Sequence, residues 1–188
     1  TNPFAFCTGI EAFEVDVNNA NYTSVDGVIY NKTKNHVIAY PAKKAGNIDI
    51  PEGVTIIGEY AYAGAKINQV NMGKGIYEIK KQAFAGSDVT EVNMPLVYEY
   101  ETANWAMDAF LNCNSLKKVC YVSGSYEDKA NISIGSFNDY LLKATWYYNC
   151  GEEGDFIYSV SNGKAIIAGL DKDISGQVNI PSTIGGYP

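Results

Sequence analysis

Apolar residues recur through the middle of the chain in one spacing, apolar-x-x-apolar-x-apolar, and this spacing repeats. It occurs at Ile67/Val70/Met72, at Val89/Val92/Met94 and, more loosely, at Leu116/Val119/Tyr121. The last two apolar positions of each copy flank a polar one, as in a strand with one buried face. An alanine-aromatic pair precedes each copy and begins at residue 61, 83 or 109. These steps fit the period of about 20–29 residues of one common class of repeat protein.

The N-terminus is predicted to hold a further copy, in which Ala5-Phe6 precedes Ile10, Phe13 and Val15. Residues 22–41 then consist of two β-rich runs around a polar segment, which predicts an inserted hairpin. Residues 48–51 supply the strand of the next repeat. The aromatic side chains expected to point into the core are those of Phe6, Phe13, Tyr62, Phe84 and Phe110.

A single repeat cannot bury its own apolar face, so neighbouring repeats must stack and align their outward residues in columns. One predicted column holds Asp49, Asn71, Asn93 and Cys120, and the column before it holds Asn47, Gln69, Glu91 and Lys118. Two interpretations remain open. The columns form a ligand-binding face, with Asn47, Asp49, Gln69, Asn71, Glu91, Asn93 and Lys118 as its residues, or their amides form a ladder of hydrogen bonds between repeats.

Composition narrows the classes of partner. The chain has 188 residues, 46% of them hydrophobic, which suffices for a core in one or two domains. Its formal net charge is −7 and its 14 Lys and Arg residues are scattered, so a nucleic-acid partner is not expected. No apolar run reaches the ~18 residues of a membrane span, and no membrane insertion is predicted.

The four cysteines divide into two pairs. Cys7 and Cys113 each lie three residues before the first apolar position of a repeat, so both are predicted to lie in one buried column. Cys120 and Cys150 either form a disulfide or remain free, because sequence cannot fix connectivity. No Cys/His cluster has the spacing of zinc ligands, and neither a metal site nor a cofactor is predicted.

Little in the chain suggests catalysis. It contains one histidine, His36, and no motif places a nucleophile beside it, so no catalytic residue is predicted. Aromatic residues make up 13% of the chain, and exposed rings could stack on sugars. The best candidates for an exposed aromatic patch are Trp105, Trp146 and Tyr147.

The alanine-aromatic pairs, the strand spacing, the prolines that follow it and residues 54–62 together resemble the BspA-like leucine-rich repeats of bacterial surface proteins. The resemblance implies an α/β repeat solenoid wound as a right-handed superhelix, β-rich, with short helices or turns and inserted β-hairpins. A parallel sheet is expected on one face, and short helices or turns are expected on the other.

The same resemblance divides the chain. Residues 1–149 are predicted to form one array, with a hairpin insertion at 22–41 and a closing segment at 121–149. Residues 150–188 are predicted to begin a second array, whose opening hairpin at 154–169 contains the turn sequence Asn162-Gly163.

The resemblance implies an extracellular or cell-surface protein whose secretion signal and anchor lie outside this chain. The implied role is recognition or adhesion, without catalysis, toward a protein or glycan ligand. Two other functions remain open: a structural spacer, and the accessory region of a larger secreted enzyme.

Overall fold

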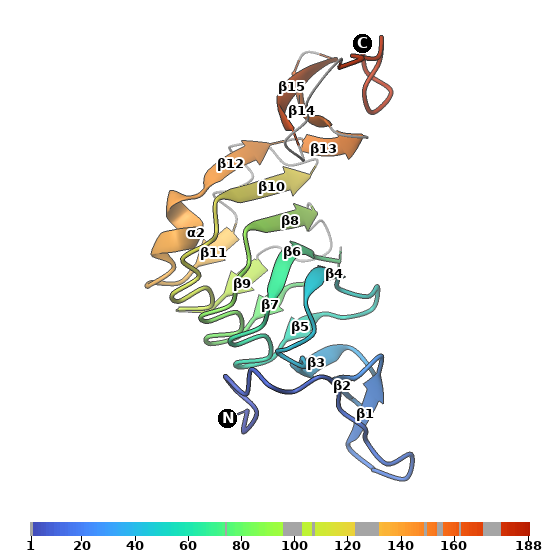
Figure 1. The fold of residues 1–188 in the computed structure, drawn as a ribbon, viewed down its shortest axis with the longest axis vertical. Helices are drawn as coiled ribbons and strands as arrows, with labels where there is room; N and C mark the ends of the chain where they lie inside the picture. The colour runs from blue at the N-terminus through green and yellow to red at the C-terminus, as the bar shows by residue number, and fades with distance from the viewer. Residues whose placement is uncertain are drawn as a thin grey trace.

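Two β-sheets packed face to face form the body of the protein in a computed structural model (Figure 1). A smaller three-stranded sheet lies at the C-terminal end, and the N-terminus lies at the other end. The structure describes residues 2–73, 75–95, 103–106, 108–122, 132–148, 150–153, 156–161, 163–170 and 178–188.

Each repeat contributes one strand to each large sheet. The back sheet contains the parallel strands β3 (His36–Ala39), β5 (Ile56–Ile57), β7 (Glu78–Ile79), β9 (Ala103–Trp105) and β11 (Ile132–Ile134). The front sheet contains the parallel strands β4 (Gly46–Asp49), β6 (Ile67–Asn71), β8 (Glu91–Pro95), β10 (Lys118–Val122) and β12 (Thr145–Tyr148). The sequence predicted the front sheet, but it predicted only turns or short helices where the back sheet lies.

The apolar positions of the three central copies point between the sheets, as predicted. Val70, Val92 and Val119 pair in register along the front sheet, and each is completely buried. Ile57 and Ile79 of the back sheet are also completely buried. The continuous core therefore arises because each repeat covers the apolar face of the next.

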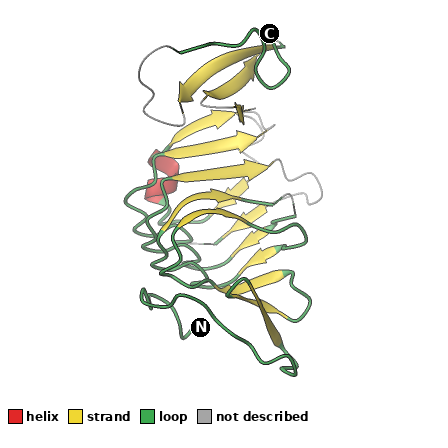
Figure 2. Ribbon diagram, turned by 45° about the vertical axis from the view of Figure 1, so that its right-hand side comes forward, coloured by secondary structure: helices red, strands yellow, loops and turns green. Residues whose placement is uncertain are grey.

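Aromatic rings form a second continuous element of the core. Tyr40, Tyr62, Phe84 and Phe110 follow one another at 4.9 Å between ring centroids. The two contacts of Phe84 are stacked, with interplanar angles of 7°. We call this row the aromatic ladder. Each of its residues lies in a segment that leads from a strand of the back sheet to the next strand of the front sheet. These connecting segments are drawn as green loops along one side of the sheets in Figure 2.

Backbone hydrogen bonds between repeats fix the turns beside the aromatic ladder. The N–H of Tyr62 donates to the carbonyl of Ala83 (2.7 Å), and the N–H of Phe84 donates to that of Ala109 (2.8 Å). At the last step the N–H of Phe110 donates instead to Oδ1 of Asn138 (2.8 Å). Asn138 is completely buried and precedes the short helix α2 (Asp139–Lys143). Its side chain thus replaces the backbone of a further turn.

The N-terminal segment differs from its predicted structure. Residues 2–21 contain no strand, Phe6 is 52% exposed, and Cys7 is exposed rather than buried. Cys113, in contrast, is buried as predicted. The N-terminal segment is not a repeat because Tyr40 occupies the aromatic position of the first repeat. The N–H of Tyr40 donates there to the carbonyl of Ala61 (2.8 Å). The first alanine-aromatic pair is therefore Ala39-Tyr40.

The predicted hairpin at 22–41 is a three-stranded antiparallel arrangement. β1 (Tyr22–Val25) pairs with β2 (Val28–Asn31), and β2 pairs with β3. Asp26 and Gly27, which join β1 to β2, both have positive φ, as the tightest hairpin turns require. Because β3 also pairs in parallel with β5, it belongs to the first repeat as well as to the hairpin.

The C-terminal sheet consists of β13 (Cys150–Glu153), β14 (Phe156–Ser161) and β15 (Lys164–Leu170), all antiparallel. Gly163, between β14 and β15, has the left-handed backbone that its turn demands, while Asn162 lies outside the described residues. A disulfide joins Cys150 to Cys120 of β10. Among the described residues, no helix is both long and apolar enough to cross a membrane.

Candidate binding surfaces

The outer face of the front sheet carries the two predicted polar columns. Asp49, Asn71 and Asn93 pair in register on successive strands, and Asn93 pairs with Cys120. In the neighbouring column Gln69 pairs with Glu91, and Glu91 pairs with Lys118. The alignment of these residues from the repeat spacing is therefore confirmed. We call this surface the polar face.

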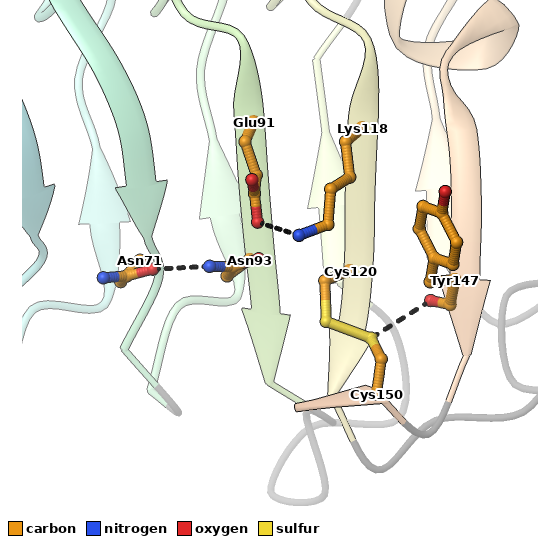
Figure 3. Close-up of a disulfide and its surroundings, with 7 residues drawn as sticks. All are labelled: Asn71, Glu91, Asn93, Lys118, Cys120, Tyr147 and Cys150. Atoms are coloured by element: carbon orange, nitrogen blue, oxygen red, sulfur yellow. Dashed lines mark hydrogen bonds and ion pairs between the residues drawn. A yellow bond between two sulfur atoms is a disulfide. The ribbon is translucent and has the colours of Figure 1, made fainter. Parts of the chain in front are cut away.

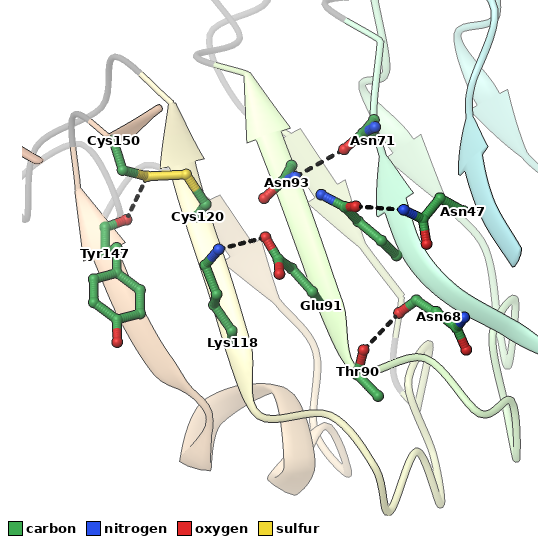
Figure 4. A network of polar contacts seen from close by, with 11 residues as sticks. Asn47, Asn68, Asn71, Thr90, Glu91, Asn93, Lys118, Cys120, Tyr147 and Cys150 are labelled. Atoms are coloured by element: carbon green, nitrogen blue, oxygen red, sulfur yellow. Dashed lines mark hydrogen bonds and ion pairs between the residues drawn. A yellow bond between two sulfur atoms is a disulfide. The ribbon is translucent and has the colours of Figure 1, made fainter. Parts of the chain in front are cut away.

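Side chains of the polar face bond to one another from repeat to repeat (Figure 4). The Asn71 amide donates to Asp49 Oδ1 (2.6 Å), and the Asn93 amide donates to Asn71 Oδ1 (2.8 Å). The Asn47 amide donates to Gln69 Oε1 (2.9 Å). The ladder of amide hydrogen bonds, one of the two interpretations of these columns, is thus present. It holds the side chains in place without covering them, since Asn47 and Asp49 stay exposed.

An ion pair closes the second column. Lys118 Nζ lies 2.6 Å from Glu91 Oε1, and the two side chains are only 13% and 14% exposed. Lys118 Nζ also lies 6.0 Å from the centroid of the Tyr147 ring, within range of a cation–π contact. The polar face is therefore open at β4, half-buried at β6 and more enclosed at β8 and β10.

The disulfide ends the first column (Figure 3). Cys120 and Cys150 are 1% and 3% exposed, and Cys150 Sγ lies 3.4 Å from the Tyr147 carbonyl oxygen. Asn93 Oδ1, one step before Cys120, is buried and accepts no hydrogen bond from the described part of the chain. The start of the C-terminal sheet thus lies against the end of the polar face, where β13 contacts β10.

The predicted aromatic patch does not form as one surface. Trp146 pairs with Val119 and packs against the core, and its Nε1–H donates to the Leu141 carbonyl (3.0 Å). Tyr147 is half-buried beside Lys118 on the polar face. Trp105 lies in β9 of the back sheet, and its side chain is outside the described part of the structure. Of the three residues, Tyr147 alone is found at the polar face.

A separate cavity of about 690 Å³ lies on the outer side of the back sheet, at its N-terminal end. Residues 2–19, which we call the strap, form one wall with Phe4, Phe13 and Glu14. His36 and Ile38 of β3 line it from the sheet, beside Gly58. Sequence reasoning missed this cavity, because its residues come from several elements and carry no common motif. We call it the strap cavity.

The imidazole of His36 is packed tightly at this cavity. Its Nε2 is buried and has no hydrogen-bond partner among the described residues. A Cβ at residue 58 would lie 3.0 Å from that atom and 2.6 Å from the Val37 carbonyl oxygen, so only glycine fits there. Burial first, and the positive charge of Lys80 second, lower the pKa of His36 below its ordinary value of 6.5, against an opposing effect of Glu78. His36 is therefore neutral at neutral pH.

This neutral imidazole should make the protein acid-sensitive. Because the pKa of His36 is lower in the folded than in the unfolded state, the unfolded state binds more protons below pH 6.5. The His36 contribution to the free energy of unfolding should therefore fall as the pH drops through and below 6.5. Melting curves of wild type and His36→Gln at about pH 7.5 and about pH 5 test this. The variant should lose less stability than wild type, and an equal loss would contradict the assignment.

The described residues contain no group of three or more His, Cys, Asp or Glu side chains placed to hold a metal ion.

The repeats themselves decide the family. The family model for the BspA type leucine rich repeat region matches residues 36–143 in six copies. The chain belongs to the BspA-type leucine-rich repeat family. Its BspA-type region begins at the first residue of β3 and ends with the last residue of α2. It thus includes the polar face up to β10, while the whole strap and the whole C-terminal sheet lie outside it.

Solved structures with some similarity to this BspA-type chain come from other bacterial proteins. A leucine-rich repeat protein from Eubacterium ventriosum ATCC 27560 is 21% identical over 64% of the chain and 38% of its own, with a TM-score of 0.48. A leucine rich cell surface protein from Faecalibacterium prausnitzii A2-165 is 20% identical, and the match covers 82% of this chain and 48% of that protein, also with a TM-score of 0.48. Pneumococcal vaccine antigen PcpA is 16% identical, and the match covers 73% of this chain and 39% of that protein, again with a TM-score of 0.48. The chain spans less than half of each, and no curated protein matches it significantly.

Proposed function

We propose that the protein is a non-enzymatic recognition module at the outside of a bacterial cell, which binds a protein or glycan through the polar face. We further propose that its repeats wind as a right-handed solenoid, with the polar face along one side. Membership of the BspA-type family supports both proposals. Extended sheet faces of stacked repeats are the surfaces that such proteins use for binding.

The observation that carries the proposal is the state of the polar side chains on β4. Asn47 and Asp49 are exposed, but hydrogen bonds to the next repeat already hold them in place. A ligand that contacts them does not have to order flexible side chains, and it therefore avoids part of the entropy cost of binding. The remaining lone pairs and N–H groups are available to a protein or sugar.

The disulfide supports an extracellular location. Disulfides persist in oxidising compartments and are rare in the reducing cytosol. Cys120 and Cys150 are joined and almost completely buried, which is typical of a structural rather than a catalytic bond. A buried structural disulfide therefore fits a protein that folds in an oxidising compartment after export.

Binding of the purified chain to arrays of glycans and extracellular-matrix proteins tests the proposed function. The Asn47→Ala/Asp49→Ala variant should bind any ligand found on the arrays at least about tenfold more weakly than wild type. Asn18→Ala/Asp139→Ala is the matched control, because it removes the same two groups at exposed positions away from the polar face. Its affinity should match that of wild type.

The other possible functions predict different outcomes. No binding on either array, with an intact fold, would contradict the recognition proposal and favour a spacer. The amide ladder fits a spacer as well, because it would stabilise the stack without any ligand. Binding that is equal in both variants would show that the ligand occupies another surface. A catalytic domain in the same polypeptide would favour the accessory region of a secreted enzyme.

A further inference from the structure

We propose that the strap cavity is a second binding site, which takes the side chain of an arginine on a partner peptide. The site lies on the back sheet, whereas the polar face belongs to the front sheet. It is therefore independent of the function proposed above. The argument rests on the rigidity of the walls, the size of the cavity, its apolar surface and its charge.

The strap is held to the sheet by specific hydrogen bonds. The Asn2 amide donates to the carbonyls of Ile38 (3.1 Å) and Tyr60 (3.2 Å), and its Oδ1 accepts from the Phe4 N–H (3.0 Å). Further along, the Phe13 N–H donates to the Gly27 carbonyl (3.0 Å). Both ends of the wall are thus fixed before any ligand arrives, so little ordering opposes binding.

The size and surface of the cavity suit a short peptide segment. Its volume of about 690 Å³ lies within the ~300–1,000 Å³ that is usual for ligand sites. Phe4 and Phe13 contact each other at 4.9 Å between ring centroids, and Tyr22 adds a third ring to the lining. Phe4 and Tyr22 are 40% and 43% exposed, so parts of their rings remain uncovered. These rings offer surface on which a flat group can stack.

The charge of the lining selects a cation. Glu14, Asp16 and Glu59 contribute three carboxylates, all on exposed residues. Two ammonium groups oppose them: Lys80 in the lining, and Lys32, which donates to the strap carbonyls of Val17 and Asn19. The Lys80 Nζ also lies 3.9 Å from Glu78 Oε2, and this carboxylate offsets part of the positive charge of Lys80. His36 adds no positive charge at neutral pH, because partial burial and Lys80 lower the pKa of its ring below 6.5. An anionic ligand would meet net repulsion, whereas a cation would be attracted.

Arginine meets both conditions better than the alternatives. Its guanidinium group is planar, stacks on aromatic rings and donates to carboxylates in a fixed fork, while its aliphatic stem packs on apolar surface. A lysine ammonium is more strongly hydrated and does not stack as a plane. A neutral sugar would leave the carboxylates without a cation. The combination of rings and carboxylates therefore points to arginine.

Calorimetric titration with acetyl-Gly-Arg-Gly-amide tests the proposal. The matched probe is acetyl-Gly-citrulline-Gly-amide, which has nearly the same shape but no charge. We expect the arginine peptide to bind wild type at least about tenfold more tightly than the citrulline peptide, because charge-assisted hydrogen bonds are the stronger ones. Equal affinities, or no binding of the arginine peptide at millimolar concentration, would overturn the proposal.

Variants and a spectroscopic signal locate the binding. Glu14→Gln/Glu59→Gln should weaken arginine-peptide binding by at least about tenfold, whereas the matched control Glu52→Gln/Asp88→Asn, at exposed acids outside the cavity lining, should not. An equal loss of arginine-peptide affinity in both double variants would mean that the net charge of the protein alone attracts the peptide. Because His36 is the only histidine, its imidazole C–H signals in an NMR spectrum report on the cavity of the wild-type protein. They should shift with the arginine peptide, and binding without a shift would place the peptide elsewhere.

Discussion

Replacing Phe84 with alanine should lower the free energy of unfolding by about 3–5 kcal/mol, as is typical for a fully buried aromatic residue. Phe84 is completely buried and stacks on both Tyr62 and Phe110 at 4.9 Å between ring centroids. Its removal leaves a cavity in the middle of the aromatic ladder and takes one contact from each neighbouring repeat. Urea denaturation, followed by circular dichroism, measures the loss.

Phe6→Ala is the matched control for this change. It deletes the same side chain, but Phe6 is 52% exposed and lies outside the aromatic ladder. We expect it to cost less than about 1 kcal/mol. If the two variants lost the same stability, the aromatic ladder would contribute no more to the free energy of unfolding than an exposed ring does.

Removing the disulfide with Cys120→Ser/Cys150→Ser should cost about 3–4 kcal/mol, the value expected from the entropy of closing a loop of this length. The two cysteines are separated by 30 residues, and their bond joins β10 to the C-terminal sheet. Hydrogen exchange should therefore speed up more in β13–β15 than in β6 and β8. Thermal melting and amide exchange measure the two effects.

Reduction of the wild-type protein provides the control for the serine variant, since it breaks the same bond without changing the chain. Cys7 and Cys113 are free in both cases, and Cys113 is buried with its pKa raised to about 11, mainly by burial, so it stays protonated. Reduced wild type and the double variant should melt together. A variant as stable as the oxidised protein would show that the bond does not constrain the fold.

The front sheet could be predicted from the sequence because its strands carry a strong signal. Three apolar residues with fixed spacing recur in each central copy, and they align Glu91 with Lys118 and Asn71 with Asn93 without any structure. The repeat spacing could not predict the side-chain contacts between neighbouring strands. The short Lys118–Glu91 ion pair and the amide bonds depend on rotamers that no periodic pattern specifies.

The back sheet escaped prediction because its strands are short. β5 and β7 contain two residues each, too few for alternation to be recognised. The first repeat was misplaced for a related reason. Ala39-Tyr40 is continuous with the strand β3, whereas Ala5-Phe6 matches the repeat spacing in isolation. Tyr40 occupies the aromatic position of the first repeat because its ring is buried against Tyr62, whereas Phe6 stays exposed.

The strap cavity could not be predicted because its walls are brought together by distant contacts. Asn2 reaches Ile38 and Tyr60, which are 36 and 58 residues away in the sequence. Neither the strap nor β3 contains a motif that indicates the other. Such a site depends on the tertiary structure alone, and it becomes visible once the strap has been placed on the back sheet.

The position of the disulfide determines how the protein would carry mechanical tension. Force applied to the C-terminal end reaches Cys150 through β13 and passes directly to Cys120 in β10. The segment between the two cysteines, which includes α2 and β12, lies outside this path and would not be stretched. Pulling would therefore load β10, a strand paired on both sides, rather than peel the last repeat from the stack.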